Sequence, residues 1–307
     1  MSLLVADPGF FSTVQDQGRP GARGFGVPVG GAADRESLAI ANALAGNPAD
    51  SPALETTLRG GTFEALDDLG IALAGARMEA TVVGPSGRRA VAVPGSGRMR
   101  RGDRLVLGRA ETGARTYLAV PGGFRVDGWM GGRSSETPLK AGDVLPAAPG
   151  RLAWRRPADV VEADPTAPIR ILPGPDQSLL SDPDDLTRRR FRVGAQSNRM
   201  GLRLEGPPVR VAATPERLSA PVTPGAVQAV GGALIVLGVA CGTMGGYPHV
   251  AQVVSTDLDR LGRLRPGDVV TFQAVTLADA RRLDREARAS LRARASRIRC
   301  AAGDPAG

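Results

Sequence analysis

The chain has 307 residues, of which 42% are hydrophobic and 4% aromatic, and its formal charge at pH 7 is +8. No stretch approaches the roughly 20 apolar residues of a membrane-spanning helix, and the N-terminus lacks the features of a secretory signal, so we expect a cytoplasmic protein without a membrane span. One histidine with two distant cysteines excludes a zinc site, and the sequence around the only lysine, Lys140, excludes a Walker P-loop.

Short apolar runs closed by glycine or proline predict a mainly β protein with a few helices. The first helix is predicted to begin at Asp34 and to end at Gly46, because Leu38, Ala41 and Leu44 recur at helical spacing between them. Strands are predicted at 116–120, 169–175, 234–237, 250–254 and 269–272. A Gly-Asp pair precedes an apolar run at 102–103, 142–143 and 267–268. Each pair predicts a tight turn entering a strand, as in a β-barrel.

The composition of the chain changes twice along its length. Residues 157–168 are rich in Ala, Asp, Glu and Pro, which is typical of a linker and predicts domains at 1–160 and 168–275. Residues 276–307 are predicted to form a basic amphipathic helix and tail, with Thr276 as the cap. Between positions 281 and 299 eight arginines oppose two acids, a balance of +6. The apolar stripe of this helix favours packing on the body or on another subunit, and the lack of aromatic residues argues against nucleic acid.

Glycine and proline are most dense in residues 13–34, which read TVQDQGRPG at the start and GVPVGGAAD at the end. Such a segment does not pack as an ordinary core element. We interpret it as a fixed polar surface that displays Gln15, Asp16, Arg19 and Asp34.

Two further positions carry charge in an informative context. Glu55 is an acid in an apolar run, and such groups are either paired structural residues or general bases. Arg199 and Arg203 stand four apart beside a glycine, a spacing that suits two guanidinium groups converging on a carboxylate or phosphate. The alternative is a strand edge with one arginine paired to Glu205.

The only histidine, His249, follows Gly245, Gly246 and Tyr247, where paired glycines allow close approach of the backbone to a ligand. Cys241 stands eight positions earlier and could join His249 in a nucleophilic pair, although its apolar flank favours a buried, inert thiol.

Several motifs together resemble one family. They are Thr13-Val-Gln-Asp-x-Gly-Arg-Pro-Gly21, Gly26-Val-Pro28, Gly31-Ala-Ala-Asp34, Gly46-Asn-Pro48, Ala53-Leu-Glu55, Tyr117-Leu-Ala-Val-x-Gly-Gly123, Ser197-Asn-Arg-Met-Gly201, Gly245-Gly-Tyr-Pro248 and Leu264-Arg-Pro-Gly-Asp268. In this order they are similar to the allophanate hydrolase subunit 2 family, also called the KipA-like or biotin-dependent carboxyltransferase family. The resemblance covers about residues 3 to 275 and leaves out the C-terminal helix.

The resemblance implies two cyclophilin-like β-barrel domains followed by the C-terminal helix. It implies that the chain is the C subunit of an ATP-dependent 5-oxoprolinase, an enzyme that opens 5-oxoproline to L-glutamate with ATP and Mg. The implied partners are a KipI-like protein, which is the B subunit, and a third protein, the A subunit. Carried onto this chain, it implies catalytic roles for Asp16, Asp34 and Glu55, and substrate or phosphate binding by Gln15, Arg19, Arg199, Gly245, Gly246, Tyr247 and His249.

Two alternatives stay open. One is a carboxyltransferase component acting on a urea-like or amide substrate. Biotin would then arrive on a partner, because the chain has no Ala-Met-Lys-Met motif. The other is a non-catalytic regulatory partner. Two departures favour this last interpretation: His249 stands where the family has a lysine, after an altered 242–244 stretch, and the loop after Ser135 is short.

Overall fold

The computed structural model describes residues 1–155, 164, 166–212 and 218–303. Contacts divide the chain into two compact units. Unit 1 comprises residues 1–18, 34–161 and 289–307, and unit 2 comprises 19–33 and 162–288. The glycine-rich segment 19–33 is therefore part of unit 2, although it stands between two stretches of unit 1 in the sequence. The linker expected at 157–168 lies largely outside the described residues.

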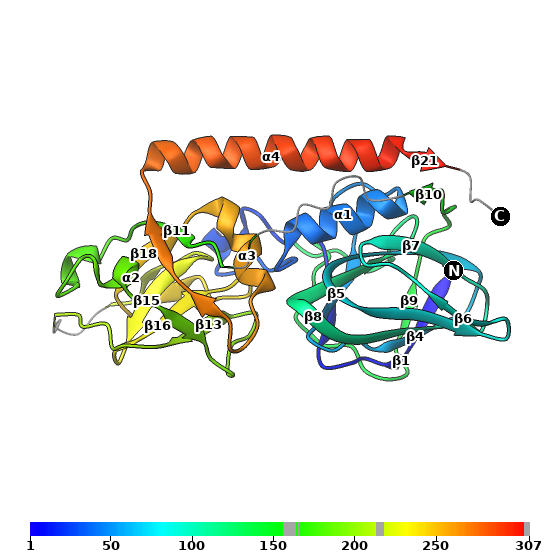
Figure 1. Ribbon diagram of the computed structural model, residues 1–307, viewed down its shortest axis with the longest axis horizontal. Helices are drawn as coiled ribbons and strands as arrows, with labels where there is room; N and C mark the ends of the chain where they lie inside the picture. The colour runs from blue at the N-terminus through cyan, green and yellow to red at the C-terminus, as the bar shows by residue number, and fades with distance from the viewer. Residues whose placement is uncertain (156–163, 165, 213–217, 304–307) are drawn as a thin grey trace. The chain divides into compact units, whose positions relative to one another are not determined.

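Unit 1 is built on one mostly antiparallel sheet of nine strands with the order β2-β3-β8-β4-β1-β9, to which β5 adds β6 and β7 (Figure 1). The elements of this unit are β1 (Ser2–Asp7), β2 (Ser12–Gln15), α1 (Arg35–Ala45), β3 (Ala53–Thr57), β4 (Thr62–Ala65), β5 (Leu69–Gly84), β6 (Gly87–Ala90), β7 (Gly95–Met99), β8 (Arg104–Ala119), β9 (Val144–Pro146), β10 (Trp154–Arg155) and β21 (Ala302–Gly303). The core inside the sheet is formed by fully buried side chains such as Leu3, Phe63, Ile71 and Leu105.

Two strands are much longer than the short runs expected from the sequence. Both β5 and β8 have 16 residues, and they pair with each other. Irregularities in the register between Gly75 and Ala80 let β5 bend without ending, so that the two strands contribute to several parts of one barrel-like sheet. The strand predicted at 116–120 is therefore the last part of the much longer β8.

Helix α1 begins and ends where its sequence predicts. Asp34 is its N-cap and accepts a hydrogen bond from the Ser37 backbone N–H, and Gly46 is its left-handed C-cap. The apolar face, which includes Leu38 and Leu44, is fully buried, and the helix packs against β5 and β8.

Unit 2 contains an eight-stranded sheet with the order β19-β12-β13-β16-β15-β18-β11-β20, in which β11 and β20 are parallel. The elements of this unit are η1 (Ala22–Phe25), β11 (Ile169–Pro173), η2 (Gln177–Leu179), α2 (Asp185–Arg188), β12 (Phe191–Val193), β13 (Gly201–Glu205), β14 (Ala220–Pro221), β15 (Ala226–Val230), β16 (Ala233–Leu237), β17 (Met244–Gly245), β18 (His249–Val253), η3 (Ser255–Asp257), α3 (Leu258–Arg263), β19 (Val269–Val270) and β20 (Phe272–Ala274). Its core is a second apolar cluster that includes Phe191, Leu204, Val236 and Phe272.

The three Gly-Asp turns are confirmed, since each stands directly before a strand, namely β8, β9 and β19. In all three turns the glycine has a positive φ of 86° to 94°, a conformation that glycine adopts without strain. The expectation of a mainly β protein with a few helices is likewise confirmed.

Helix α4 (Leu277–Cys300) is the longest described helix, and Thr276 caps it by accepting a hydrogen bond from the Asp279 N–H (Figure 1). The expected continuous apolar stripe is not buried throughout. Ala280, Ala295 and Ile298 are buried, whereas every residue from 285 to 290 is exposed. Burial of this helix is therefore concentrated towards its two ends. Among the described residues no helix is both long enough and apolar enough to cross a membrane.

Candidate functional site

A row of buried polar side chains crosses the sheet of unit 1. The strand register places Thr13 of β2 opposite Glu55 of β3, and Glu55 opposite Tyr117 of β8. All three are 0% exposed. Because residues that pair directly across strands lie on the same face, one face of this otherwise apolar sheet carries polar groups that must satisfy one another.

Tyr117 is the centre of this network. Its hydroxyl donates to Oε2 of Glu55 at 2.6 Å and accepts from the backbone N–H of Asp34 at 2.9 Å. Burial, followed by the charges of Glu55 and Asp34, raises the pKa of Tyr117 well above its ordinary value of 10.0. The tyrosine therefore stays protonated and acts as a fixed donor, not as a base.

Arg115 lies next to Glu55 on the same pair of strands. Its Nε is 3.5 Å from Oε1 of Glu55, and the two side chains are 6% and 0% exposed. Glu55 thus has a guanidinium on one oxygen and a phenol on the other. Of the two roles that the sequence context of Glu55 allowed, this environment favours the paired residue, because removal of either partner would leave a buried charge without compensation.

Asp34 connects this network to helix α1. Its carboxylate accepts from the Ser37 backbone N–H at 3.1 Å and from the Ser37 hydroxyl at 2.5 Å. Its own backbone N–H donates to the Tyr117 hydroxyl. Asp34 therefore fixes the start of α1 relative to β8, and its side chain is 0% exposed.

Asp16 organises the turn that follows β2. Its carboxylate accepts hydrogen bonds from the backbone N–H of Gly18 at 2.7 Å, from the backbone N–H of Arg133 at 2.6 Å and from the Ser134 hydroxyl. Three donors on one carboxylate hold the glycine-rich turn against the 133–134 loop. Ser134 stands directly before Ser135, after which the loop is short.

Gln15 is fully buried beside this turn. Its amide nitrogen donates to Oγ1 of Thr13 at 2.8 Å and to the carbonyl of Ser135 at 2.7 Å. Its Oε1 is buried without a hydrogen-bond partner among the described residues. An unused buried acceptor normally costs stability, so Gln15 is the candidate residue of unit 1 with a polar atom still to be satisfied.

In unit 2, Arg199 holds the glycine-rich segment 19–33. It is 7% exposed, and its Nη2 donates to the carbonyl of Gly31 at 2.7 Å. The backbone N–H of Gly30 donates to the carbonyl of Val239 at 3.0 Å, and the N–H of Arg19 closes the segment on the carbonyl of Val29 at 2.7 Å. The segment therefore has a defined shape that is fixed by residues far from it in the sequence.

The expected pair of converging arginines is not built. Arg199 is buried in the turn before β13, whereas Arg203 is exposed on that strand. The reason is that Arg199 lies outside β13, in the turn before it, where its side chain is held by the carbonyl of Gly31, whereas Arg203 lies on the exposed face of the strand.

Cys241 is buried next to Arg23. Burial raises the pKa of its thiol, while the charge and hydrogen bond of Arg23 oppose this shift. The expectation that Cys241 is buried is confirmed, and a buried thiol with a raised pKa is a poor nucleophile.

His249 begins β18. Its backbone N–H donates to Oδ2 of Asp176 at 2.8 Å. Burial lowers the pKa of the imidazole below 6.5, opposed by the backbone of Ala251, the charge of Asp176 and the side chain of Gln252. Nε2 of His249 is buried without a partner among the described residues. The ring is therefore neutral at physiological pH and does not replace the positive charge of a lysine.

Residues 245, 246 and 247 differ in how closely other atoms pack against them. A Cβ at Gly245 would come within 2.6 Å of the amide nitrogen of Gln228, while one at Gly246 would meet only Oγ of Ser219 at 3.7 Å. Tyr247 is 52% exposed. A side chain at Gly245 would thus require Gln228 to shift, whereas Gly246 and Tyr247 lie at the surface.

Metal binding receives no support from the residues that the structure describes, because no three His, Cys, Asp or Glu side chains cluster there.

The candidate residues fall into two groups, Gln15, Asp16, Asp34 and Glu55 in unit 1, and Arg19, Arg199, Gly245, Gly246, Tyr247 and His249 in unit 2. Sequence reasoning missed Arg115, Tyr117 and Ser134 as partners of the first group. The available signal was the presence of Arg115 and Tyr117 two apart in an apolar strand.

Comparisons with known proteins place this arrangement in context. A family model described as "Carboxyltransferase domain, subdomain A and B" matches residues 25–274. The chain is 35% identical to the C subunit of 5-oxoprolinase from Escherichia coli K12, over 91% of this chain and 93% of that protein. It is 30% identical to the corresponding 5-oxoprolinase protein of Haemophilus influenzae, over 90% of this chain and 92% of that protein.

A solved structure gives the same result for the fold. The urea amidolyase of K. lactis superimposes with a TM-score of 0.85 at 26% identity, covering 95% of this chain and 20% of that longer chain. The family model covers most of the sequence, and two relatives match almost from end to end. The chain therefore belongs to the carboxyltransferase-domain family, subdomains A and B, which was expected from its motifs.

Proposed function

We propose that this chain is the C subunit of a heteromeric, ATP-dependent 5-oxoprolinase that opens the lactam of 5-oxoproline to L-glutamate. The observation that carries the proposal is the 35% identity to the 5-oxoprolinase C subunit over 93% of that protein. The match to urea amidolyase, by contrast, covers only a fifth of the longer chain. A relative of similar length and similar sequence along its whole extent is the better guide to the role of a separate subunit.

The candidate residues support a role in shaping the site. Asp16, Tyr117 and Arg199 direct their hydrogen bonds to the backbone at or beside the glycine-rich segment, at Gly18, Asp34 and Gly31. A rigid segment of this kind presents backbone N–H groups and the Arg19 side chain in a fixed arrangement, which suits binding of a carboxylate or of an activated, phosphorylated lactam oxygen. In this proposal Arg19 and Arg199, both in unit 2, bind the anion.

The carboxylates of this chain do not fit a Mg site built by the chain alone. Asp16 already accepts three hydrogen bonds, and Asp34 caps α1. The described residues contain no cluster of three metal-ligating side chains. We therefore assign no step of the reaction to the metal here. In the proposal ATP and Mg act in the assembled complex.

The surface of unit 2 supports a partner of the KipI-like type, the B subunit of 5-oxoprolinase. Phe25, Met200, Met244 and Tyr247 are 79%, 60%, 53% and 52% exposed. Nη2 of Arg23 donates to the carbonyl of Thr243 at 3.4 Å, which brings the neighbourhoods of Phe25 and Met244 together. Exposed large apolar side chains of this kind favour a protein interface.

The proposal is tested by Arg199→Ala in the complex reconstituted with the A and B subunits. Turnover of 5-oxoproline should be lost while complex formation is retained. Arg203→Ala is the matched control, because Arg203 is exposed four positions away and should leave turnover unchanged. Since Arg199 is buried, Arg199→Lys is measured in parallel, and it should fold and recover part of the turnover. Full activity in Arg199→Ala would contradict the proposed role of Arg199 in anion binding.

The alternative of a carboxyltransferase is favoured by one observation, the description of the matching family model. Under this alternative, a biotin-carrying partner would be required, and turnover of an amide or urea-like substrate would depend on bicarbonate and be blocked by avidin. Turnover of 5-oxoproline that is insensitive to avidin would exclude it.

A further inference from the structure

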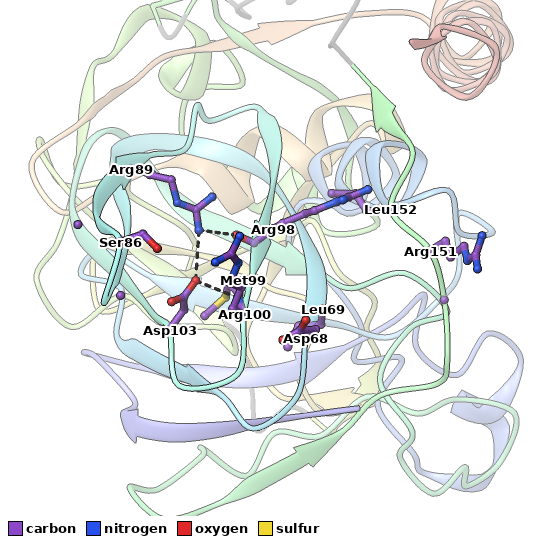
Figure 2. A pocket seen from close by; sticks show the side chains of 13 residues that line it. Asp68, Leu69, Ser86, Arg89, Arg98, Met99, Arg100, Asp103, Arg151 and Leu152 are labelled. Atoms are coloured by element: carbon purple, nitrogen blue, oxygen red, sulfur yellow. Dashed lines mark hydrogen bonds and ion pairs between the residues drawn. The ribbon is translucent and has the colours of Figure 1, made fainter. Parts of the chain in front are cut away.

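A cavity of about 650 Å³ opens on unit 1, away from the polar row at Tyr117. It is lined by the strands β5, β6 and β7 and by the loops around 100–103 and 150–152. Figure 2 shows its side chains: Arg89 and Arg100 lie near Asp103, the Arg98 side chain extends away from Asp103 toward Leu152, and Arg151 lies at the far edge. None of these residues is a candidate site residue on sequence grounds.

The charge of this cavity is positive. Four arginines and two aspartates line it. Both aspartates already accept backbone hydrogen bonds: Asp103 from the N–H of Arg100 at 2.9 Å, and Asp68 from the N–H of Arg101 at 2.8 Å. The acids therefore shape the loop as well as offsetting part of the charge, and the lining keeps an excess of two positive charges.

Arg89 is held in place before any ligand arrives. Its Nη2 lies 3.2 Å from Oδ2 of Asp103 and donates to the carbonyl of Arg98 at 3.1 Å (Figure 2). Asp103 is only 4% exposed, so this anchor is firmly embedded. A guanidinium that is fixed through one nitrogen keeps further N–H donors for a second acceptor and loses less side-chain entropy on binding.

Arg98 and Arg100 extend this cation group. They stand two apart around the buried Met99, which places both on the exposed side of the chain. Neither guanidinium has a carboxylate partner among the residues that the structure describes. Ser86, in the turn between β5 and β6, adds a hydroxyl donor to the rim.

The floor of the cavity is apolar and contains no aromatic ring. Leu69, Met99 and Leu152 line it, and the first two are 5% and 1% exposed. The volume is in the range of cavities that hold a small organic ligand. Because no aromatic side chain among the described residues lines it, recognition by base stacking is not provided for, and the charged rim must supply the specificity.

We propose that this cavity binds a small phosphorylated molecule, whose phosphate lies between Arg89 and Arg100. Phosphate oxygens match the planar donor fork of arginine, and a dianionic phosphate balances the excess of two positive charges in the lining. The apolar floor receives the body of the ligand. This proposal is independent of the 5-oxoprolinase assignment, because it concerns binding by this chain alone.

The test is isothermal titration of the full chain with inorganic pyrophosphate at low ionic strength. We expect saturable binding of one equivalent that weakens as salt is added. Arg100→Gln should weaken it by roughly 10- to 100-fold, the loss expected for charge-assisted hydrogen bonds to an anion. Arg88→Gln is the matched control: Arg88 is exposed on the same strand as Arg89 but does not line the cavity, and its loss should leave the affinity unchanged.

Arg98→Gln provides a second, independent variant. It removes one positive charge from the lining without removing a proposed phosphate donor, so it should weaken binding less than Arg100→Gln does. A titration with citrate separates phosphate recognition from a general attraction for anions, and we expect citrate to bind at least about tenfold more weakly. The proposal is overturned by absence of saturable pyrophosphate binding, by equal weakening in Arg88→Gln, or by citrate binding as tightly as pyrophosphate.

Discussion

Replacement of Tyr117 by phenylalanine tests the buried network directly. The change removes one hydroxyl that donates to Glu55 at 2.6 Å and accepts from the N–H of Asp34 at 2.9 Å. It leaves a buried carboxylate oxygen and a buried N–H with one partner fewer. Since each such loss costs about 1–3 kcal/mol, we expect the free energy of unfolding of unit 1 to fall by roughly 2–6 kcal/mol.

The chain supplies its own control, because it contains only two tyrosines. Tyr247 is 52% exposed, so Tyr247→Phe should change stability by less than about 0.5 kcal/mol. Urea unfolding followed by tryptophan fluorescence is the assay, since both tryptophans, Trp129 and Trp154, are in the stretch assigned to unit 1. Equal stability of Tyr117→Phe and wild type would refute the reasoning.

Tyr117→Phe should also change how the stability of the protein depends on pH. Burial raises the pKa of Tyr117 above 10.0, so the protonated hydroxyl is favoured in the folded state. This stabilisation is fully present below pH 10 and is lost as the pH rises through the folded-state pKa. Wild type should therefore lose stability in strong alkali faster than Tyr117→Phe, and parallel alkaline unfolding curves would contradict the assigned environment.

Three further predictions concern single positions. The proton NMR titration of the only histidine, His249, should give a pKa below 6.5, so that its contribution to stability is lost as the pH falls below that value; a pKa above 6.5 would show that the ring is not desolvated. Gly245→Ala should cost about 1 kcal/mol, because its Cβ would displace the amide end of Gln228 at 2.6 Å and press on Cγ1 of Val222 at 3.1 Å, whereas Gly246→Ala should be tolerated, and thermal unfolding of both variants checks the difference. Phe25→Ser should leave the fold intact, because this side chain is 79% exposed, but weaken co-purification with the B subunit at least about tenfold; undiminished co-purification would remove Phe25 from the interface.

Local signals in the sequence predicted local structure well. The limits of α1 follow from Asp34 and Gly46, whose side-chain and backbone properties act within a few residues. The three Gly-Asp turns and the cap of α4 at Thr276 are signals of the same kind. Each depends only on neighbouring residues, so no knowledge of the tertiary structure is needed.

Pairings between distant residues could not be predicted in this way. The contact of Glu55 with Tyr117 depends on the register of β3 and β8, and the two residues are 62 positions apart in the sequence. The arginine-lined cavity collects residues from β6, β7 and the 150–152 loop, none of which carries a recognisable motif. The assignment of segment 19–33 to unit 2 is likewise a property of long-range contacts.

The roles of the candidate residues can be interpreted only when these long-range pairings are known. The sequence presents Asp16 as an acid on a glycine-rich surface, yet its three donors include Arg133 and Ser134, which are 117 and 118 positions away. Arg199 was expected to be one of a converging pair, but it lies in the turn before β13 and donates to the carbonyl of Gly31, whereas Arg203 is exposed on the strand. In both cases the sequence identified the candidate residue but not the residues that its side chain contacts.

The most direct test of the proposed function is glutamate release from 5-oxoproline by this chain reconstituted with the A and B subunits. We predict turnover that requires ATP and all three proteins and that is lost in Arg199→Ala while the complex still forms. A stable complex that releases no glutamate from 5-oxoproline, under conditions where the Escherichia coli proteins do, would contradict the proposal.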